Sequence, residues 1–203
     1  MGFYSDVILP KLCDLSMRNE RLHPYRERVI GAAEGRVLEI GVGSGLNLPF
    51  YHPAVREILA LEPAPSLLAM ARRVPHPGMP VSFIEASAES IPLDDGSVDT
   101  VVTTWTLCTI PQATSALAEM RRVLKPEGKL LFVEHGLSPD RGVRWWQNRL
   151  TPVWRRISGG CHLNRPIRSM IEGEGFRIDR IETGYMPGPK PMTFMYEGSA
   201  RPK

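Results

Sequence analysis

The sequence predicts an α/β fold in which a mostly parallel β-sheet lies between helices. Short apolar segments rich in β-branched residues alternate with segments of helical periodicity, which is typical of parallel strands joined by helical crossovers. The last two apolar segments are joined only by a glycine- and proline-rich stretch, residues 184–191, and so short a connection makes an antiparallel hairpin. We therefore expect a seven-stranded mixed sheet, with one antiparallel C-terminal strand and helices on both faces.

The expected elements follow the apolar patterns along the chain. Strands are expected at residues 36–40, 58–61, 81–84, 98–103, 129–134, 176–182 and 192–197. Helices are expected at residues 66–73, 113–124, 141–157 and 165–174, and residues 3–33 are expected to be helical with one break. The loose apolar stripe of that first segment comprises Val7, Ile8, Leu12 and Leu15. Pro24 and Pro152 are expected to interrupt helices, because proline lacks the amide that an inner helical turn needs.

The chain of 203 residues suits one domain with a complete hydrophobic core, and no repeat or linker divides it. Four regions are expected within this domain. They are an N-terminal helical cap (1–33), a cofactor-binding core (34–136), a helical lid or substrate segment (137–175) and a C-terminal hairpin (176–203).

Composition excludes several classes of protein. The formal net charge of +3 at pH 7 is too small to favour nucleic acid as the main partner. Cys13, Cys108 and Cys161 form no C-x-x-C pair, so the sequence predicts neither a metal site nor a disulfide framework, and dispersed thiols fit a cytoplasmic location. No window of about eighteen apolar residues predicts a membrane span, and the N-terminus does not resemble a secretory signal.

A glycine-rich loop follows the first expected strand and is the strongest local signal. Gly41, Gly43 and Gly45 allow tight turns and close approach of the backbone to a ligand. Their spacing departs from the G-x-G-x-x-G of dinucleotide-binding loops, because Leu46 stands where the third glycine would be. Glu39 lies inside the buried strand, where a carboxylate is costly unless a cation meets it. The loop therefore predicts a site for a positively charged cofactor rather than for a pyrophosphate.

Acidic residues follow the next strands. Glu62 and Pro63 end the second strand, where one carboxylate can accept hydrogen bonds from both hydroxyls of a ribose. Residues 85–89 follow the third strand, at the place where an adenine ring would lie. Asp99 begins the fourth strand and is interpreted as a turn residue rather than a catalytic one.

These segments resemble the class I methyltransferases, and the resemblance covers nearly the whole chain. Their fold is Rossmann-like, and their methyl donor is S-adenosylmethionine (SAM). Three segments, residues 105–108, 132–135 and 160–163, resemble more specifically the branch that includes methyltransferase-like thiol S-methyltransferases and soluble bacterial relatives. Two departures are visible: Ser87 stands where many relatives have an aspartate for the adenine amine, and the sequence lacks the apolar N-terminal anchor of the membrane-bound members.

The strand ends and the resemblance together give the expected site residues. Those for the cofactor are Glu39, Gly41, Gly43, Gly45, Asn47, Glu62, Pro63, Ser87, Ala88, Glu89, Thr104 and Leu107. Those for the acceptor are Trp105, Cys108, Trp146, Cys161 and His162. His135 follows a strand end and is the catalytic candidate, able to take a proton from a thiol or amine, although a purely structural role stays open. Cys161 and His162 are adjacent and are expected to point apart.

The expected helix at residues 141–157 carries apolar side chains on one face. They are Trp146, Leu150, Val153, Trp154 and Ile157. Two interpretations stay open: this face packs on the core, or it forms a lid over an apolar substrate that touches a membrane surface.

The acceptor follows least directly from the residues. Transfer of a methyl group from a sulfonium is an in-line displacement, which mainly needs two groups held in line. We expect a small-molecule acceptor, with a thiol as the first hypothesis. The alternative is an amine head group such as phosphatidylethanolamine, and the third hypothesis is a SAM-binding regulator without activity. The sequence leaves the oligomeric state open.

Overall fold

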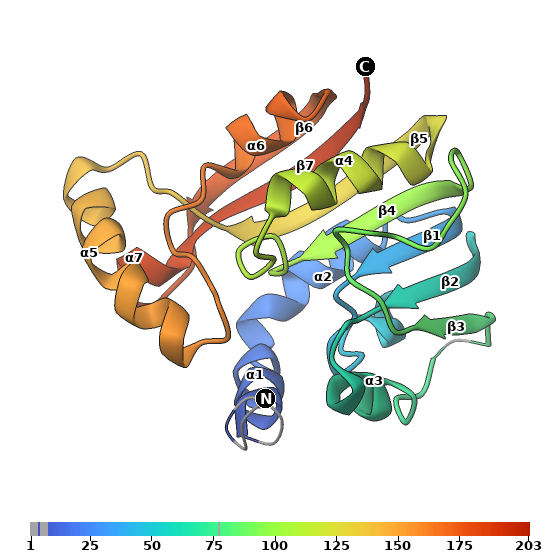
Figure 1. Ribbon diagram of the computed structural model, residues 1–203, viewed down its shortest axis with the longest axis horizontal. Helices are drawn as coiled ribbons and strands as arrows, with labels where there is room; N and C mark the ends of the chain where they lie inside the picture. The colour runs from blue at the N-terminus through green and yellow to red at the C-terminus, as the bar shows by residue number, and fades with distance from the viewer. Residues whose placement is uncertain (1–3, 5–7, 77) are drawn as a thin grey trace.

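The computed structural model describes residues 4, 8–76 and 78–203. Within these residues seven strands form one sheet, in the order β3-β2-β1-β4-β5-β7-β6 (Figure 1). The strands are β1 (Gly35–Ile40), β2 (Val55–Leu61), β3 (Val81–Ile84), β4 (Val98–Thr104), β5 (Leu124–His135), β6 (Phe176–Tyr185) and β7 (Phe194–Pro202). Only β7 runs against its two neighbours, β5 and β6. The predicted mixed sheet is therefore confirmed.

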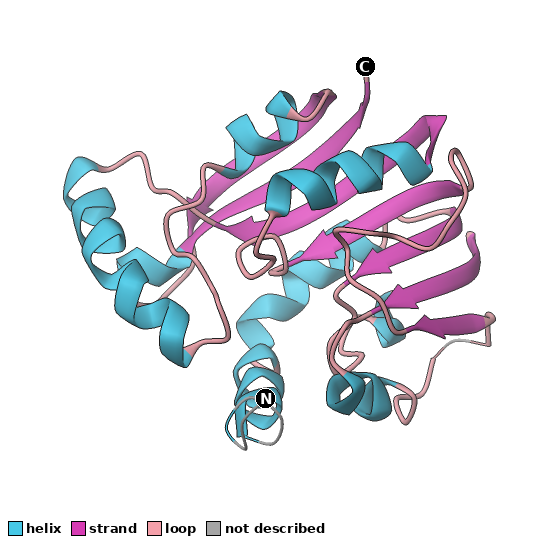
Figure 2. Cartoon of the chain, viewed as in Figure 1, coloured by secondary structure: helices cyan, strands magenta, loops and turns pink. Residues whose placement is uncertain are grey.

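Helices cover both faces of this sheet (Figure 2). They are α1 (Leu9–Met17), α2 (His23–Ile30), α3 (Pro65–Ala71), α4 (Ala113–Val123), α5 (Arg141–Ile157), α6 (Ile167–Gly173) and α7 (Lys190–Thr193), with 3₁₀ turns at η2 (Glu20–Leu22) and η3 (Leu48–Phe50). Figure 1 shows α4 and α6 in front of the sheet and α2 behind it. Alternate residues of a strand face opposite sides, so two apolar layers form: Leu38 packs with the α4 and α6 layer, and Val37 with the α2 and α3 layer.

Several element boundaries differ from the predictions. The first helical segment breaks between Met17 and Glu20, and Pro24 does not interrupt it, because Pro24 lies in the first turn of α2, where proline is tolerated. The helix α5 runs through Pro152 without the expected break. Its buried side chains Gln147 and Thr151 anchor the turn before the proline, since the Thr151 hydroxyl donates to the Gln147 carbonyl at 2.7 Å. Residues 3 and 5–7 of the predicted first helix, Val7 included, lie outside the described residues.

The strands β5 and β7 also differ in extent from the prediction. The strand β5 begins at Leu124 rather than at Lys129, and its pairing with β4 shifts register across residues 125–128, from Leu124 opposite Val98 to Lys129 opposite Thr100. The strand β7 begins at Phe194 because Lys190–Thr193 form α7, and it extends to Pro202. Apolar periodicity located each strand, and the predicted last strand overlaps only the first part of β7, because the ends of strands depend on pairing with neighbouring strands.

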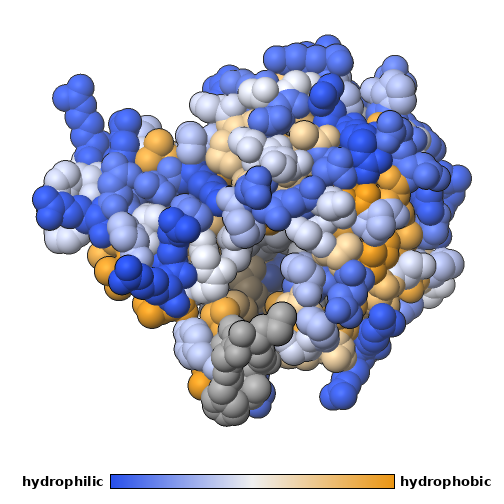
Figure 3. Space-filling view, in the orientation of Figure 1, coloured by the Kyte–Doolittle hydropathy of each residue, from blue (hydrophilic) through white to orange (hydrophobic). Residues whose placement is uncertain are grey.

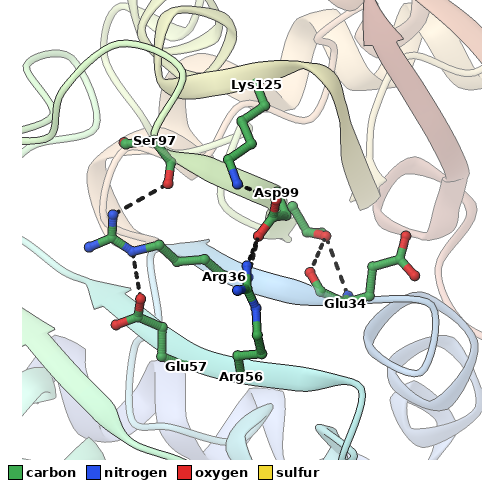
Figure 4. A network of polar contacts seen from close by, with 8 residues as sticks. Glu34, Arg36, Arg56, Glu57, Ser97, Asp99 and Lys125 are labelled. Carbon is green, nitrogen blue, oxygen red and sulfur yellow. Dashed lines mark hydrogen bonds and ion pairs between the residues drawn. The ribbon is translucent and has the colours of Figure 1, made fainter.

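Asp99 organises an ion-pair network at the end of the sheet where β4 begins (Figure 4). Its carboxylate accepts a hydrogen bond from the Arg36 amide at 2.7 Å and pairs with Lys125 at 2.6 Å and with Arg56 at 2.7 Å. Partial burial raises the pKa of Asp99, but these donors outweigh it and hold that pKa at about 2. The structural interpretation of Asp99 fits this geometry.

We predict that Asp99→Asn lowers the free energy of unfolding at neutral pH by about 1–2 kcal/mol, because the amide cannot form the charged pairs with Lys125 and Arg56. The pKa of Asp99 is depressed in the folded state, so its contribution is present above its ordinary value and is lost as the pH falls toward about 2. Urea unfolding at several pH values measures this. The exposed Asp94→Asn is the control, and an equal loss in both variants would contradict the prediction.

Candidate active site

A cavity of about 440 Å³ lies beyond the carboxyl ends of β1, β4 and β5. In the space-filling view, the surface is hollowed between α5 and the body of the molecule (Figure 3). One end of the cavity is lined by the glycine loop and Glu62, and the other by Cys108, His135 and Cys161. This is the position at which open parallel sheets bind ligands.

The three glycines of the loop have different roles. All three have positive φ angles, of 66° at Gly41, 56° at Gly43 and 85° at Gly45. A Cβ at Gly41 would lie 2.5 Å from the Thr106 side chain, and one at Gly45 would lie 3.0 Å from the Ala71 backbone. At Gly43 the nearest atom would be a backbone oxygen 3.9 Å away, so its surroundings are open. Gly41 and Gly45 serve packing, and Gly43 leaves room for a ligand beside the backbone.

Glu62 holds the glycine loop against the end of β2. Its carboxylate accepts hydrogen bonds from the Gly43 amide at 3.1 Å and from the Ala64 amide at 3.0 Å. Burial raises the pKa of Glu62, and the two amides oppose this rise. Each carboxylate oxygen has a second lone pair, so Glu62 still has acceptor capacity toward the cavity that it lines.

Glu39 is buried beneath the glycine loop, and its carboxylate is hydrogen-bonded to side chains that follow the loop. Its two oxygens accept hydrogen bonds from the Asn47 amide at 2.7 Å and from the Tyr51 hydroxyl at 3.0 Å. The buried Arg26 donates to Asn47 at 2.9 Å and is the nearby positive charge. Asn47 also donates to Thr104 at 2.9 Å, so this cluster joins the glycine loop to the end of β4.

A second buried carboxylate, Glu134, fixes the opposite wall. One of its oxygens accepts hydrogen bonds from the Thr103 hydroxyl at 2.9 Å and from the Thr106 and Leu107 amides at 3.0 and 3.1 Å. These bonds bracket Trp105, which has a positive φ of 50°. Such a backbone conformation is uncommon outside glycine and persists where the surroundings hold it. Glu134 thus positions the loop that carries Trp105 into the cavity.

Two cysteines and a histidine meet at the acceptor end. The His135 Nε2 atom lies 3.0 Å from the Cys161 Sγ atom, and the Cys108 thiol belongs to the same cluster. A hydrogen bond with Cys108, together with burial, raises the pKa of the Cys161 thiol well above its ordinary range. His162 points away from this pair, with its Nδ1 atom 3.1 Å from the Cys108 carbonyl oxygen. Cys161 and His162 therefore form no dyad.

The cavity brings together about half of the expected site residues. Those that line it are Gly41, Gly43, Asn47, Glu62, Thr104, Trp105, Cys108, His135 and Cys161. Those outside its lining are Glu39, Gly45, Pro63, Ser87, Ala88, Glu89, Leu107, Trp146 and His162. The Ser87 hydroxyl instead accepts a hydrogen bond from the Glu89 amide at 3.2 Å, in an exposed turn. Whether these outer residues contact a bound cofactor stays a prediction.

Other lining residues were not expected from the sequence. Cys13, Asp14 and Met17 come from α1, Trp154 from α5, and Met186, Met192 and Met195 from the C-terminal hairpin region. No local motif marks them, because each reaches the site through long-range packing. The sequence marks Glu134 only as part of the resembling segment 132–135, because its role depends on hydrogen bonds to residues about thirty positions earlier.

The predicted apolar face of α5 does not pack on the core as a whole. Trp146, Leu150, Val153 and Ile157 are exposed, at 53%, 36%, 61% and 52%, whereas Trp154 is half-buried and lines the cavity. The core-packing interpretation is therefore wrong for four of these five residues. The core on this side is completed by Gln147 and Thr151, on the other face of the helix.

Comparison with known proteins agrees with this geometry. Residues 38–132, from β1 to β5, match the methyltransferase domain family. The chain belongs to the class I methyltransferases. The match spans the glycine loop, Glu62 and the Glu134-anchored loop, which together form the donor end and one wall of the cavity.

Two of the similar proteins are thiol S-methyltransferases. The chain is 34% identical to thiol S-methyltransferase TMT1B of Rattus norvegicus over 77% of this chain and 65% of that protein. It is 36% identical to TMT1B of Homo sapiens over 74% and 64%. The chain thus spans about two thirds of the length of these relatives. A phosphatidylethanolamine N-methyltransferase of Cereibacter sphaeroides is 34% identical over 56% of each chain.

Solved structures share the fold. A SAM-dependent methyltransferase from Mesorhizobium loti superposes with a TM-score of 0.69 at 17% identity, covering 91% of this chain and 99% of the other. One from Aquifex aeolicus gives 0.68 at 18% identity, covering 96% and 98%.

The residues present fit SAM, the cofactor of this class. The open backbone beside Gly43 leaves space for a ligand, and Glu62 retains free acceptor capacity for a diol. The carboxylate of Glu62 lines this end of the cavity, where it favours a cationic ligand over a pyrophosphate. These residues would hold the cofactor, which when bound supplies the electrophilic methyl group.

Glu39 gives a prediction on stability. Burial raises its pKa to about 7, despite the hydrogen bonds from Asn47 and Tyr51. Between its ordinary value of 4.5 and about 7, the unfolded chain has ionised this group while the folded chain still holds the proton, so raising the pH favours unfolding. We expect the free energy of unfolding of the wild type to fall across this window, on the order of 1–3 kcal/mol, relative to Glu39→Gln.

Urea unfolding of both proteins in SAM-free buffer at about pH 5 and about pH 8 measures this difference. The exposed Glu85→Gln is the control and should follow the wild type at both pH values. If Glu39→Gln also follows the wild type, Glu39 does not change its protonation in this window.

Glu62 gives a prediction on cofactor affinity. Glu62→Ala should weaken SAM binding by about 2 kcal/mol, roughly thirty-fold, because it removes charge-assisted hydrogen bonds and releases the Gly43 amide. Calorimetric titration measures the affinity. The control is Glu57→Ala, an acid nearer the other end of β2 that pairs with Arg36. A folded Glu62→Ala protein with unchanged affinity would remove Glu62 from the cofactor site.

Proposed function

We propose that this protein transfers a methyl group from SAM to a small-molecule thiol. The observation that carries the proposal is one continuous cavity that joins the glycine loop and Glu62 at one end to the Cys108–His135–Cys161 cluster at the other. An in-line displacement needs the donor and the acceptor held together, in line, within one enclosure.

The lining of the acceptor end supports an acceptor of low polarity. Met186, Met192 and Met195 approach from the C-terminal hairpin region, and Trp154 and Leu163 from the segment that includes α5. These side chains exclude water, which competes with a bound nucleophile for its partners. Thioether side chains also adapt their shape to different ligands, so a range of small thiols fits this wall.

The chain's own residues have separate tasks in the proposed reaction. Glu62 and the Gly43 backbone orient the donor, while Glu134 fixes the loop that carries Trp105 and Cys108 against it. A thiolate is a strong nucleophile, and its attack on a sulfonium methyl requires no proton transfer at the reacting carbon. The rat and human thiol S-methyltransferases support the thiol as acceptor.

The test is a methyl-transfer assay on a panel of small thiols, with products identified by mass spectrometry. We expect methyl thioethers, and a rate that rises with pH toward the pKa of the free thiol, about 8.5, because only the thiolate reacts. Glu62→Ala should lower the rate at limiting SAM, and Glu57→Ala should not. SAM binding without turnover of any substrate would instead support the hypothesis of a regulator.

A second candidate function is methylation of an amine head group at a lipid surface. The exposed apolar side chains of α5, together with Leu12 and Leu15 of α1, favour it, since both helices also border the cavity. Exposed Arg149, Arg155 and Arg156 on α5 would meet anionic lipid. The described residues include no helix long and apolar enough to cross a membrane, so such contact would be peripheral.

The same assay separates the two candidates when vesicles containing phosphatidylethanolamine join the panel. A methylated amine on the vesicles, with no methyl thioether from any thiol, would replace the thiol proposal with this second function. Methyl thioethers and unmodified vesicles would retain the thiol.

A further inference from the structure

Three ligand atoms of the kind that bind soft metal ions converge at the acceptor end of the cavity. The Sγ atoms of Cys108 and Cys161 and a ring nitrogen of His135 all lie within 4.8 Å of one another. Each residue also lines the cavity, so the cluster is accessible from it. Imidazole with two thiols is a donor set that suits Zn²⁺.

The protein holds the three segments that carry these atoms by contacts of their own. Glu134 binds the Leu107 amide, next to Cys108, and is itself next to His135. The Arg165 guanidinium donates to the carbonyls of Leu107 and Ile110. The His162 amide donates to the Cys108 carbonyl at 2.8 Å, which ties the loop of Cys161 to that of Cys108. The ligand atoms are therefore placed before any ion binds.

The side-chain atoms of this cluster are only weakly or incompletely hydrogen-bonded. The His135 Nδ1 atom is buried without a partner among the described residues, so the polar contacts of the ring lie on the Nε2 side, toward Cys161. Besides its hydrogen bond with Cys161, the Cys108 thiol has two long contacts, 3.4 Å to the Trp105 carbonyl and 3.4 Å to the Thr109 hydroxyl. A thiol is a weak hydrogen-bond donor and acceptor, so these contacts stabilise the buried Cys108 sulfur only weakly.

We propose that Cys108, His135 and Cys161 bind one Zn²⁺ ion, with the fourth coordination position open to the cavity. Zinc–sulfur bonds of about 2.3 Å at tetrahedral angles place two sulfurs ~3.8 Å apart. The observed atoms, within 4.8 Å of one another and 3.0 Å apart at the closest pair, reach this spacing by shifts of about 1 Å or less. Three protein ligands with one open position characterise catalytic zinc sites.

The charge of such a site balances within the cluster. Both cysteines bind as thiolates, so two protons leave to solvent as the ion enters, and the added charge is zero. This neutrality matters because the guanidinium of Arg165 lies beside the cluster, where it donates to the carbonyl of Leu107, the neighbour of Cys108. A cation bound by neutral ligands would be repelled by that group, whereas a dithiolate site is not.

The open position gives the ion a role in the reaction, and this part rests on the proposed function. An acceptor thiol that binds there loses its proton to solvent and stays as a thiolate near neutral pH, since a zinc ion lowers the pKa of its ligand. The acceptor sulfur forms a bond to the methyl carbon, the bond from that carbon to the sulfonium breaks, and its electron pair stays on the donor sulfur. The donor leaves as a neutral thioether.

The test begins with metal binding by the whole protein. The protein is stripped with a chelator under reducing conditions and titrated with Zn²⁺, with the metal content measured after desalting; Co²⁺ serves as the spectroscopic probe. We expect one equivalent of tightly bound Zn²⁺, and a thiolate-to-cobalt charge-transfer band. Cys108→Ser, Cys161→Ser and His135→Gln should each weaken binding at least tenfold, whereas Cys13→Ser, a thiol elsewhere in the same cavity, should not.

Thermal unfolding of each apo variant confirms that it remains folded, and the isosteric serines preserve volume. Absence of Zn²⁺ binding by the folded wild type would overturn the proposal. An equal loss in Cys13→Ser would overturn the assignment of the three ligands.

Methylation assays separate this proposal from the proposed function. Turnover of thiols that disappears in the stripped protein and returns with one equivalent of Zn²⁺ would support both. Full turnover by the metal-free protein would overturn the role of the ion and retain the thiol methyltransferase. Tight Zn²⁺ binding with no thiol methylated under any condition would retain the metal site and overturn the proposed function.

Discussion

The carboxylate of Glu134 is the contact on which the acceptor side of the cavity depends. It is fully buried at the end of β5, and it uses one oxygen to bind the end of β4 and the two amides that follow Trp105. A charged or strongly polar group is costly in such a position unless its partners satisfy it, and these partners come from the wall of the site itself. The hydrogen bonds to its Oε1 atom therefore fix the positive φ of Trp105 and the location of Cys108, while its buried Oε2 atom has no hydrogen-bond partner among the described residues.

The donor side repeats this principle with different partners. Glu39 is buried beneath the glycine loop, and Asn47 links it to Arg26 and to Thr104. The two carboxylates lie on β1 and β5, with β4 between them; Glu134 is bonded directly to the end of β4, and Glu39 is linked to it through Asn47. Strand order thus places two polar anchors on either side of the strand that leads into the cavity.

The sequence predicted well those features that are local or periodic. Short patterns locate the strands, the glycine loop and the acid Glu62 after the second strand. The glycine loop and Glu62 both line the cavity. It predicted poorly what depends on distant segments. Cys108 and Cys161 are 53 positions apart and form no spaced motif, so their meeting at His135 is visible only after the sheet assembles. The same limit applies to α5, whose apolar face resembles a core face by periodicity and yet is exposed.

The antiparallel strand β7 has a consequence for the order of assembly. It inserts between β5 and β6, and its pairing places Met195 opposite His135. Among the described strands it is the last in chain order, so β6 has no place in the sheet until residues 194–202 have been synthesised and docked. The donor pocket is built from segments before residue 110, whereas the acceptor wall closes only with this final strand. A nascent chain would thus complete the donor end of the cavity before the acceptor end.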